Sequence, residues 1–369
     1  MADGVAGLDA AQWDAVAGSD NPFLSHGFLA ALESSGSVGA GTGWQPVPLI
    51  LDEGGVIRGA LPAYLKSHSQ GEYVFDHGWA EAWHRAGGSY YPKLQIAVPF
   101  TPVPGPRLLA RDADSTRQLI AAAEALTDQN GLSSAHATFV DADQLALFRE
   151  AGWLIREGLQ YHWFNKGYAD FEAFLAALSS RKRKAIRKER AAAVEGLTIR
   201  ALRGDEIEPQ HWDAFWHFYQ DTGARKWGRP YLTRDFFARI GATMGDRVLL
   251  YLAERDGRPI AGALNFIGET ALYGRYWGCT EDVPFLHFEL CYYRAIETAI
   301  ALGLSRVEAG AQGEHKLARG YEPTPTWSAH YIPHEGFRAA VADFLVRERR
   351  AVERDIAFLG EVTPFRKTG

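Results

Sequence analysis

Two stretches of this chain repeat one hairpin pattern, and the repeat limits the folds that the chain can adopt. They are VPLILDEGGVIRGALPAYL at 47–65 and VLLYLAERDGRPIAGALNFI at 248–267. Each has an apolar run, a turn with acidic residues and glycine, and then Gly-Ala-Leu, which begins at Gly59 in one copy and Gly262 in the other. Apolar runs around such a turn are typical of β-hairpins. The pattern predicts a hairpin in each half of the chain.

Three further landmarks follow each hairpin in the same order. They are an alanine-rich helical segment, a strand that begins Gly-Leu-Ser, and a Gly-Trp or Gly-Tyr pair with an aromatic strand after it. They begin at positions 114, 131 and 152 in the first copy and at 289, 303 and 320 in the second. Matched landmarks in one order indicate an internal repeat. We therefore expect an α/β (or α+β) fold with two similar domains, 1–165 and 166–369, each a mixed twisted sheet flanked by helices.

Composition sets the broad class of the protein. With 369 residues, 47% hydrophobic and 12% aromatic, the chain is long and apolar enough for two globular domains. A net charge of -6 argues against a DNA-binding partner. The two cysteines, Cys279 and Cys291, give no metal-binding framework, so we expect no metal. The N-terminus shows no secretory signal and no apolar run is long enough to span a bilayer, which predicts a cytoplasmic protein without membrane insertion.

The first copy carries an insertion rich in aromatic residues and proline, YVFDHGWAEAWHRAGGSYYPKLQIAVPFTPVPGPRLL at 73–109. Its five prolines cannot lie inside central strands, so we expect an ordered surface loop. A long, rigid, aromatic loop is typical of a binding wall. The alternative is a purely structural loop. The candidate substrate-binding residues here are Asp76, His77, Trp79, Tyr91 and Lys93.

A strongly basic helix is predicted between the copies. FEAFLAALSSRKRKAIRKERAAAVEGL, at 171–197, has apolar residues at helical spacing, seven cations between positions 181 and 190, and Gly196 to end it. Cations on successive turns can contact several phosphates of a donor at once. A solvated helix face is the alternative. The candidate donor phosphate-binding residues are Arg181, Lys182, Arg183, Lys184, Arg187 and Lys188. A C-terminal amphipathic helix over 337–359 is expected to pack against the second domain.

Polar residues gather where the strand SRVEAGAQGEHK, at 305–316, ends. Ligands of open sheets usually lie at such strand ends. Glu308, Gln312, His315 and Lys316 lie there, and Glu289 lies in the apolar helix before it. His315 is the preferred general base, because imidazole titrates near neutral pH, with Glu289 and Glu308 as further catalytic candidates. Gln312 and Lys316 are candidates for orienting a substrate carbonyl or carboxylate. A solvated loop, or proton transfer through water, is the alternative.

The aromatic strand ALYGRYWGC, at 271–279, contributes three further candidates for substrate binding. Alternation along a strand places Arg275 and Trp277 on one face and Tyr276 on the other. One of these faces is expected to line a cleft. A buried arginine there requires a carboxylate or phosphate partner. Core packing of the two aromatic residues is the alternative.

Several of these segments resemble the FemAB-like group of predicted N-acyltransferases, in the GNAT superfamily. The matching runs are 277–323, with the distinctive GAQGEHK element, FDHGWAEAW, YYPKLQIAVPFTPVPGPRLL and SSRKRKAIRKE. The resemblance implies two GNAT-like domains in tandem and transfer of an acyl or aminoacyl group to a primary amine of an amino acid, peptide or cell-wall precursor. It implies no tightly bound cofactor, with acyl-CoA or aminoacyl-tRNA as the co-substrate.

Two departures from related enzymes leave the donor open. The sequence has no room for the long helical-hairpin arm of the better-known aminoacyltransferases, in which a cationic region of the second domain is associated with the tRNA. It also lacks the Arg/Gln-x-x-Gly-x-Gly/Ala loop of acetyl-CoA users. A non-catalytic module that recognises peptidoglycan or a peptide on the same duplicated scaffold is the rival function.

Overall fold

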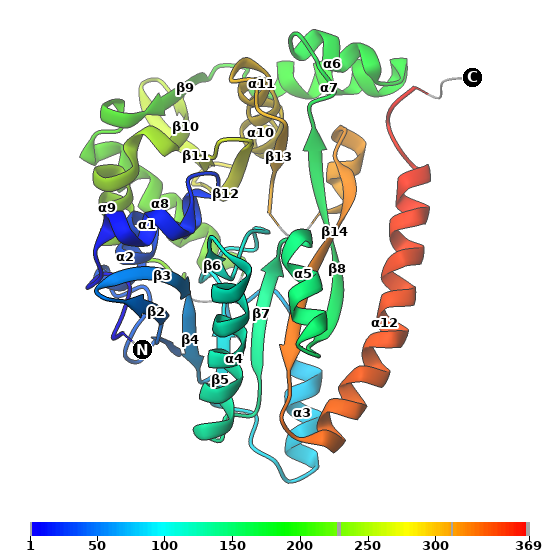
Figure 1. The fold of residues 1–369 in the computed structure, drawn as a ribbon. Coiled ribbons are helices and arrows are strands. Elements are labelled where there is room, and N and C mark those ends of the chain that lie inside the picture. Colours follow the sequence, from blue (N-terminus) through cyan, green and yellow to red (C-terminus); the bar gives the residue numbers. More distant parts are fainter. Residues whose placement is uncertain (1, 227–229, 311–312, 367–369) are drawn as a thin grey trace. The chain divides into compact units, whose positions relative to one another are not determined.

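The structure, a computed structural model, describes residues 2–226, 230–310 and 313–366. The chain divides into two compact units (Figure 1). Unit 1 contains Met1–Leu159 and Pro325–Asp355, and unit 2 contains Gln160–Thr324 and Ile356–Gly369. The division predicted from the sequence at residue 165 assigned 325–355 to the second domain, whereas these residues lie in unit 1.

Unit 1 is built on a mixed sheet with the strand order β1-β4-β5-β7-β14. Its strands are β1 (Trp44–Pro46), β4 (Ala63–Lys66), β5 (Lys93–Ile96), β7 (Ala135–Val140) and β14 (Glu322–Tyr331), and a small second sheet contains β2 (Leu49–Glu53), β3 (Val56–Leu61) and β6 (Leu109–Ala110). Its helices are α1 (Ala10–Ala17), α2 (His26–Ser34), α3 (His77–Arg85), α4 (Ala113–Gln129), α5 (Ala142–Glu150) and most of α12 (Glu335–Glu361), with a 3-10 turn at Pro22–Leu24. Ser25 caps the start of α2, because its side chain accepts a hydrogen bond from the Phe28 amide.

Unit 2 is built on parallel and antiparallel strands in the order β8-β13-β12-β11-β10-β9. Its strands are β8 (Leu154–Phe164), β9 (Thr198–Arg203), β10 (Val248–Arg255), β11 (Arg258–Ile267), β12 (Ala271–Cys279) and β13 (Arg306–Glu308). Its helices are α6 (Phe171–Ala177), α7 (Ser180–Ala193), α8 (Pro209–Lys226), α9 (Arg234–Met244), α10 (Leu286–Phe288), a π-helix (Glu289–Tyr293) and α11 (Arg294–Ala301), with 3-10 turns at Gly204–Glu206, Gly245–Arg247 and Glu314–Arg319.

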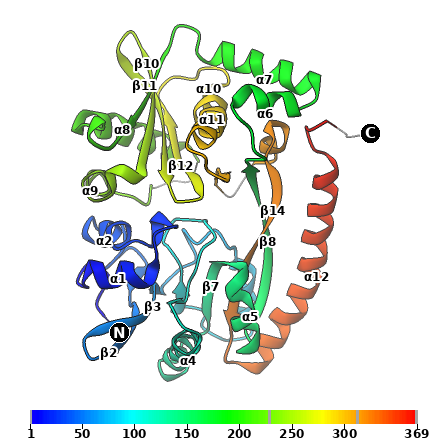
Figure 2. The same cartoon turned by 45° about the horizontal axis from the view of Figure 1, so that its top comes forward.

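Helices cover both faces of the unit 2 sheet (Figure 2). On one face α8 approaches closely, since a Cβ added to Gly278 of β12 would lie 2.2 Å from the Phe218 carbonyl oxygen. On the other face, the Tyr251 hydroxyl donates to the Arg294 carbonyl oxygen at the start of α11, at 3.0 Å. The close approach of α8 therefore requires glycine at position 278 of β12.

The predicted repeat of hairpins is confirmed. β2 pairs with β3 around Gly54 and Gly55, and β10 pairs with β11 around Asp256 and Gly257. In the first copy Pro62 separates β3 from β4, whereas β11 runs without a break through the equivalent position. Proline has no amide hydrogen for the ladder, so one long strand of the second copy corresponds to two short strands of the first.

The aromatic strand that ends each copy pairs within the opposite unit. His162, Trp163 and Phe164 of β8 pair antiparallel with β13 in unit 2. Trp327–Tyr331, the equivalent part of β14, pairs antiparallel with β7 in unit 1. Each unit is therefore completed by the aromatic strand of the other copy, and the return of the chain to unit 1 through β14 makes unit 1 discontinuous.

The prediction of a surface loop over 73–109 is wrong for much of its length. The insertion forms α3 and contributes β5, which lies between β4 and β7 in the unit 1 sheet. The prolines do lie outside the strand, as expected, but Lys93–Ile96 fits between Pro92 and Pro99. A four-residue stretch between prolines is long enough for a short central strand.

The predicted C-terminal helix is confirmed as α12, but it packs within unit 1. Phe337, Val341 and Leu345 are buried with Trp79 and Tyr90 of the insertion. Across the described residues, no helix combines the length and apolar character needed to cross a membrane.

We predict that Phe337→Ala lowers the free energy of unfolding by about 3–4 kcal/mol, because it removes a buried aromatic side chain and leaves a cavity. Phe358→Ala, on the same helix but 66% exposed, is the matched control and should change it by less than about 0.5 kcal/mol. Urea midpoints followed by tryptophan fluorescence measure both. Equal midpoints for the two variants would contradict the packing of α12.

Candidate functional site

A gap opens in unit 2 where two parallel strands separate. Among the described residues, β12 and β13 pair through Ala271, Leu272 and Tyr273 opposite Arg306, Val307 and Glu308. β13 ends there, while β12 continues to Cys279 along β11. The register between β11 and β12 shifts at Leu264, so that Arg275 is an extra residue on β12. Such bulges bend a strand and redirect its side chains, and they occur often beside active sites.

The gap contains a cavity of about 90 Å³, which we call the fork pocket. Its walls come from β11, β12, the residue after β13 and the helix that includes the π-helical turn. The lining residues are Ala263, Leu264, Asn265, Gly274, Arg275, Tyr276, Trp277, His287, Cys291, Tyr292 and Ala309. π-Helical turns within α-helices are frequent at functional sites. The fork pocket is the candidate active site.

Arg275, Tyr276 and Trp277 all line the fork pocket. The simple alternation expected from the sequence allowed only one face to do so, and the extra residue at Arg275 disrupts that alternation. Tyr276 is buried against Tyr219 of α8, with ring centroids 5.5 Å apart, and burial raises its pKa. Trp277 packs edge-on against His287, at 5.3 Å.

Lys316 has a buried amine close to this pocket. Its side chain lies in the 3-10 turn Glu314–Arg319, is 1% exposed, and its Nζ donates to the Gly310 carbonyl oxygen at 2.7 Å. Burial lowers the pKa of Lys316 to about 7, against an opposing influence from the nearby Cys291 thiol and with a contribution from Arg275. A buried ammonium loses hydration, so the neutral amine becomes accessible near neutral pH.

The His315 side chain is exposed and lies beside the helical segment that carries Phe288 and Tyr292. Its Nε2 is 2.8 Å from the Tyr292 hydroxyl, and its ring is 5.5 Å from Phe288. Burial raises the pKa of Tyr292, so this hydroxyl keeps its proton and can either donate to Nε2 or accept from it, depending on the imidazole tautomer. A Cβ at Gly313 would lie 2.6 Å from the His315 ring, so glycine is needed for this placement. Gln312 lies outside the described residues.

The two carboxylates proposed from the sequence lie in different surroundings. Glu289 is buried, and Arg190 donates to both of its oxygens at 2.9 Å while Arg294 donates at 2.8 Å. Glu308, at the end of β13, accepts from Arg306 at 2.8 Å, and its other oxygen has no hydrogen bond within the described residues. Among the described lining residues of the fork pocket, neither carboxylate is present.

Asp76 and Lys93 lie in a buried ionic cluster of unit 1. Lys93 Nζ contacts Glu72 at 2.7 Å and forms a shorter contact with Asp76. Burial alone would raise the pKa of Asp76, but Lys93 lowers it well below its usual range. Lys66 lies 3.8 Å from Glu72, and burial lowers its pKa to about 7. These charges compensate one another inside the domain, as buried charges must.

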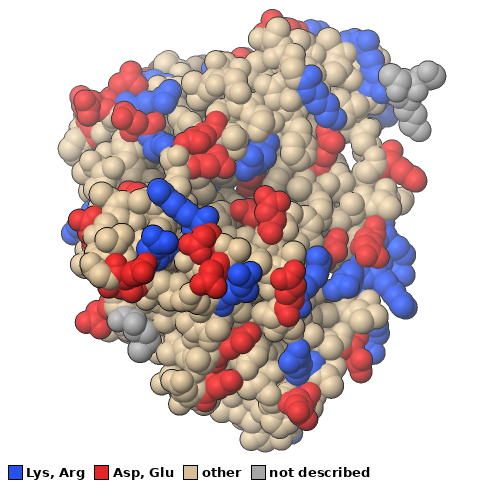
Figure 3. Space-filling view, in the orientation of Figure 1, with Lys and Arg blue, Asp and Glu red and all other residues tan. Residues whose placement is uncertain are grey.

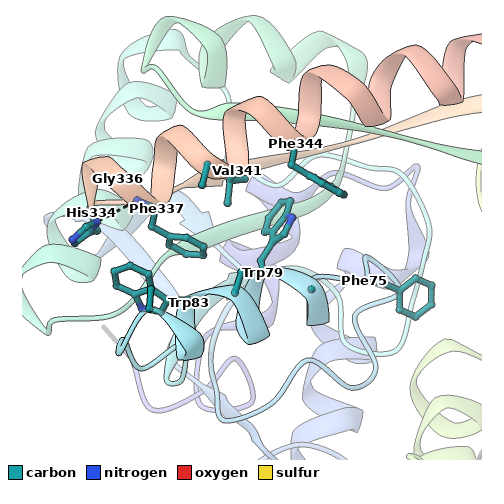
Figure 4. Close-up of a pocket in the computed structure, with 12 residues that line it drawn as sticks. Phe75, Trp79, Trp83, His334, Gly336, Phe337, Val341 and Phe344 are labelled. Atoms are coloured by element: carbon teal, nitrogen blue, oxygen red, sulfur yellow. Dashed lines mark hydrogen bonds between the residues drawn. The ribbon is translucent and has the colours of Figure 1, made fainter.

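The other insertion residues flank this cluster. The Tyr91 hydroxyl is 2.8 Å from Ser69, and His77 is exposed at the start of α3. Trp79 lines a larger apolar cavity of about 450 Å³ between α3 and α12, together with Trp83, Phe337 and Phe344 (Figure 4). The structure therefore does not bring all five insertion residues to one surface.

The basic residues predicted to bind phosphate do lie on one helix, α7. Arg181, Lys184 and Lys188 are exposed on it, and Lys182 and Arg183 are half-buried. Arg187 forms an ion pair with Glu172. Figure 3 shows Lys and Arg side chains gathered over the region of α6 and α7. This surface can attract an anionic ligand.

Sequence reasoning did not identify Asn265, His287, Cys291, Tyr292, Lys66 or Glu72 as functional candidates. A signal existed for Asn265, because it is the only polar residue in the apolar run IAGALNFI. No signal in the sequence indicated the pairing of Lys66 with Glu72, because these two charges come together only in the folded domain.

Solved structures with the same mixed α/β fold define the class of protein. FemX matches with a TM-score of 0.57 and 11% identity, over 91% of this chain and 98% of that chain. The C-terminal domain (DUF2156) of a putative lysylphosphatidylglycerol synthetase from Agrobacterium fabrum matches with a TM-score of 0.54 and 12% identity, over 91% of this chain and 96% of that chain. L-PGS from Bacillus licheniformis matches with a TM-score of 0.53 and 12% identity, over 89% of this chain and 97% of that chain. The predicted fold class is confirmed, and identities this low establish the fold alone.

The chain belongs to the FemAB-like family, described as peptidoglycan biosynthesis/recognition, whose model matches residues 4–367. The predicted resemblance is thereby confirmed. No curated protein sequence matches this chain.

We predict that the Lys316 side chain titrates near pH 7. NMR of protein labelled with ¹³C at the lysine ε-carbon measures this, and Lys316→Met identifies the signal. In the unfolded chain lysine keeps its proton up to about pH 10.4, so Lys316 makes the free energy of unfolding rise with pH between these values. The Met variant should lose that rise. A Lys316 signal that titrates near 10 would contradict the effect of burial.

Proposed function

We propose that this protein is an N-acyltransferase that moves an acyl or aminoacyl group from an activated donor to a primary amine. The acceptor is an amino acid, a peptide or a cell-wall precursor. The observation that carries the proposal is the fork pocket. It lies beside Lys316, a buried lysine of lowered pKa, and beside His315, which is hydrogen-bonded to Tyr292. Membership of the FemAB-like family supports it.

The proposed reaction begins with attack of the neutral acceptor amine on the carbonyl carbon of the donor. His315 takes the proton that the amine loses, in the tautomer whose Nε2–H donates to the Tyr292 hydroxyl. Lys316, when protonated, donates to the oxyanion that develops on the carbonyl. The bond to the donor's thiol or hydroxyl then breaks, and that leaving group takes up a proton. The products are an amide and the free carrier.

The remaining candidates take supporting roles in this proposal. Arg275, Tyr276 and Trp277 bind the transferred group, since they line the fork pocket. Glu289 holds Arg190 and Arg294 and is assigned to positioning the helix rather than to proton transfer. Glu308 lies where the strands separate and can polarise His162, which is 3.8 Å away. Gln312 is kept as a ligand of the substrate carbonyl on sequence grounds alone.

An aminoacyl donor is supported by one of the similar structures. That protein is named for the synthesis of lysylphosphatidylglycerol, a product that carries an aminoacyl group. The exposed cations of α7 are proposed to bind the donor's phosphates, which both tRNA and coenzyme A possess. A part of Asp76, His77, Trp79, Tyr91 and Lys93 in substrate binding stays a prediction from the sequence alone.

We predict that His315→Ala and Lys316→Met each lower kcat at least about 100-fold while the melting temperature changes little, because each removes a group that acts in the transition state. The assay follows label from charged tRNAs and from acyl-CoAs into a panel of amino acids and muropeptides. His84→Ala, an exposed histidine of α3, is the control and should keep wild-type turnover.

Wild-type turnover in both site variants would remove these residues from the mechanism. If the wild-type protein transfers no label but muropeptides alone raise its melting temperature, the protein is a recognition module instead.

We predict that the triple variant Arg181→Glu, Lys184→Glu, Lys188→Glu weakens donor binding at least about tenfold at low salt. These residues are exposed and spaced along one face of α7. The slope of log Kd against log salt should also fall, because fewer phosphate contacts release fewer counterions. The triple variant Arg347→Glu, Arg350→Glu, Arg354→Glu, which reverses three exposed cations of α12, is the charge-matched control. An unchanged slope in the triple variant would exclude α7 from donor binding.

A further inference from the structure

One polar side chain in the core of unit 2 has an unused hydrogen-bonding atom. Asn265 lies in β11 and is 1% exposed. Its Nδ2 faces the carbonyl oxygens of Ala263 and Leu249, at 3.3 and 3.5 Å. Since carbonyl oxygens only accept hydrogen bonds, these contacts fix which way the amide points. Its Oδ1 has no hydrogen-bond partner among the described residues, which is unusual for a buried polar atom.

This oxygen belongs to the wall of the fork pocket. Asn265 pairs with Gly274 across the two strands, and both residues line the cavity. A Cβ added to Gly274 would lie 3.4 Å from Oδ1, with its next neighbours at 3.7 Å. The absence of a side chain at Gly274 therefore leaves open the space through which a bound group can reach the oxygen.

The chemistry of the pocket restricts that group. An amide oxygen accepts but does not donate, so the complementary group must carry an N–H or O–H. The cavity has a volume of about 90 Å³, which suits a small group. Arg275 on the wall disfavours a second positive charge. An α-amino group, with an ordinary pKa near 7.7, can enter in its neutral form.

We propose that the fork pocket is the subsite for a small aminoacyl group and that Asn265 Oδ1 accepts a hydrogen bond from its α-amino group. This inference rests on the proposed transferase function and deepens it. Asn265 becomes a specificity-determining residue that separates an aminoacyl donor from a simple acyl donor of the same size. A site built to satisfy a polar group rejects the analogue that leaves that group unpaired.

The test uses two probes that differ only in the α-amino group. They are the L-alanyl and propionyl amides of 3′-amino-3′-deoxyadenosine, in which the amide resists hydrolysis and transfer. Isothermal titration calorimetry with the full-length protein should give at least about tenfold tighter binding of the alanyl probe. The preference should increase from pH 6 to pH 8, as the amine of the probe loses its proton.

Two variants test two requirements separately, namely the hydrogen-bond acceptor atom of Asn265 and the open space that leads to it. Asn265→Leu keeps the size of the side chain but removes the oxygen, and it should abolish the preference. Gly274→Ala keeps Asn265 and its backbone contacts but places a methyl group beside Oδ1, and it should weaken the alanyl probe at least about tenfold. Gly360→Ala, where an added Cβ meets nothing within 4 Å, is the matched control. Melting temperatures confirm that each variant is folded.

The outcomes for this subsite and for the transferase function are distinguishable. Equal affinity of the wild-type protein for both probes, binding of neither probe, or a preference that survives in Asn265→Leu overturns the subsite. Label transfer that proceeds equally well with alanyl and propionyl donors overturns it as well, but leaves the transferase function intact. A preference for the alanyl probe that is lost in both variants, in a protein that transfers no label, retains the subsite and overturns the function.

Discussion

The short parallel pairing of β12 with β13 is the constraint on which the functional region of unit 2 depends. Up to Tyr273 and Glu308, the two strands satisfy one another's backbone groups. Beyond that point β13 ends, and a bulge at Arg275 changes the direction of β12. Side chains from two strands and one helix can then reach the same small space. A longer β13 would close this space with backbone hydrogen bonds and leave no room for a ligand.

Ion pairs connect the basic helix to the elements around the fork pocket within unit 2. Arg190 of α7 holds Glu289 in the π-helical turn that also carries Cys291 and Tyr292. Glu189 of α7 accepts from Arg319 at 2.8 Å, and Arg319 in turn donates to the His315 carbonyl oxygen at 2.9 Å. The inward side of α7 thus positions the site, while its outward side keeps cations in solvent. Arg190 was not among the residues predicted to bind phosphate, and its ion pairs separate it from the exposed cations Arg181, Lys184 and Lys188.

Much of the fold was predictable because its signals are local. The two hairpins, the helices α2, α4, α7 and α12 and the repeat all follow from periodicity and turn residues within a few positions of each other. The exchange of β8 and β14 between units was not predictable, because both strands are aromatic and either would suit either sheet. Burial of Lys93 also depends on Glu72, 21 residues away, and that of Glu289 on Arg190, 99 residues away. Spacing in the sequence carries no information on such pairs.

The equivalent position in unit 1 explains why the chemistry is assigned to the second copy. β5 and β7 also pair in parallel over three residues, Leu94–Ile96 with Ala135–Ala137. There, however, β7 continues to Val140, and Gly105 of the proline-rich segment pairs with Val140 in the gap. The fully buried Arg107 fills the remainder, because its guanidinium donates to the carbonyl oxygens of Thr138, Val103 and Gly105. The insertion therefore seals the first fork with Gly105 and Arg107. In the second fork, within the part of the chain that the structure describes, Asn265 Oδ1 has no hydrogen-bond partner and Lys316 is buried.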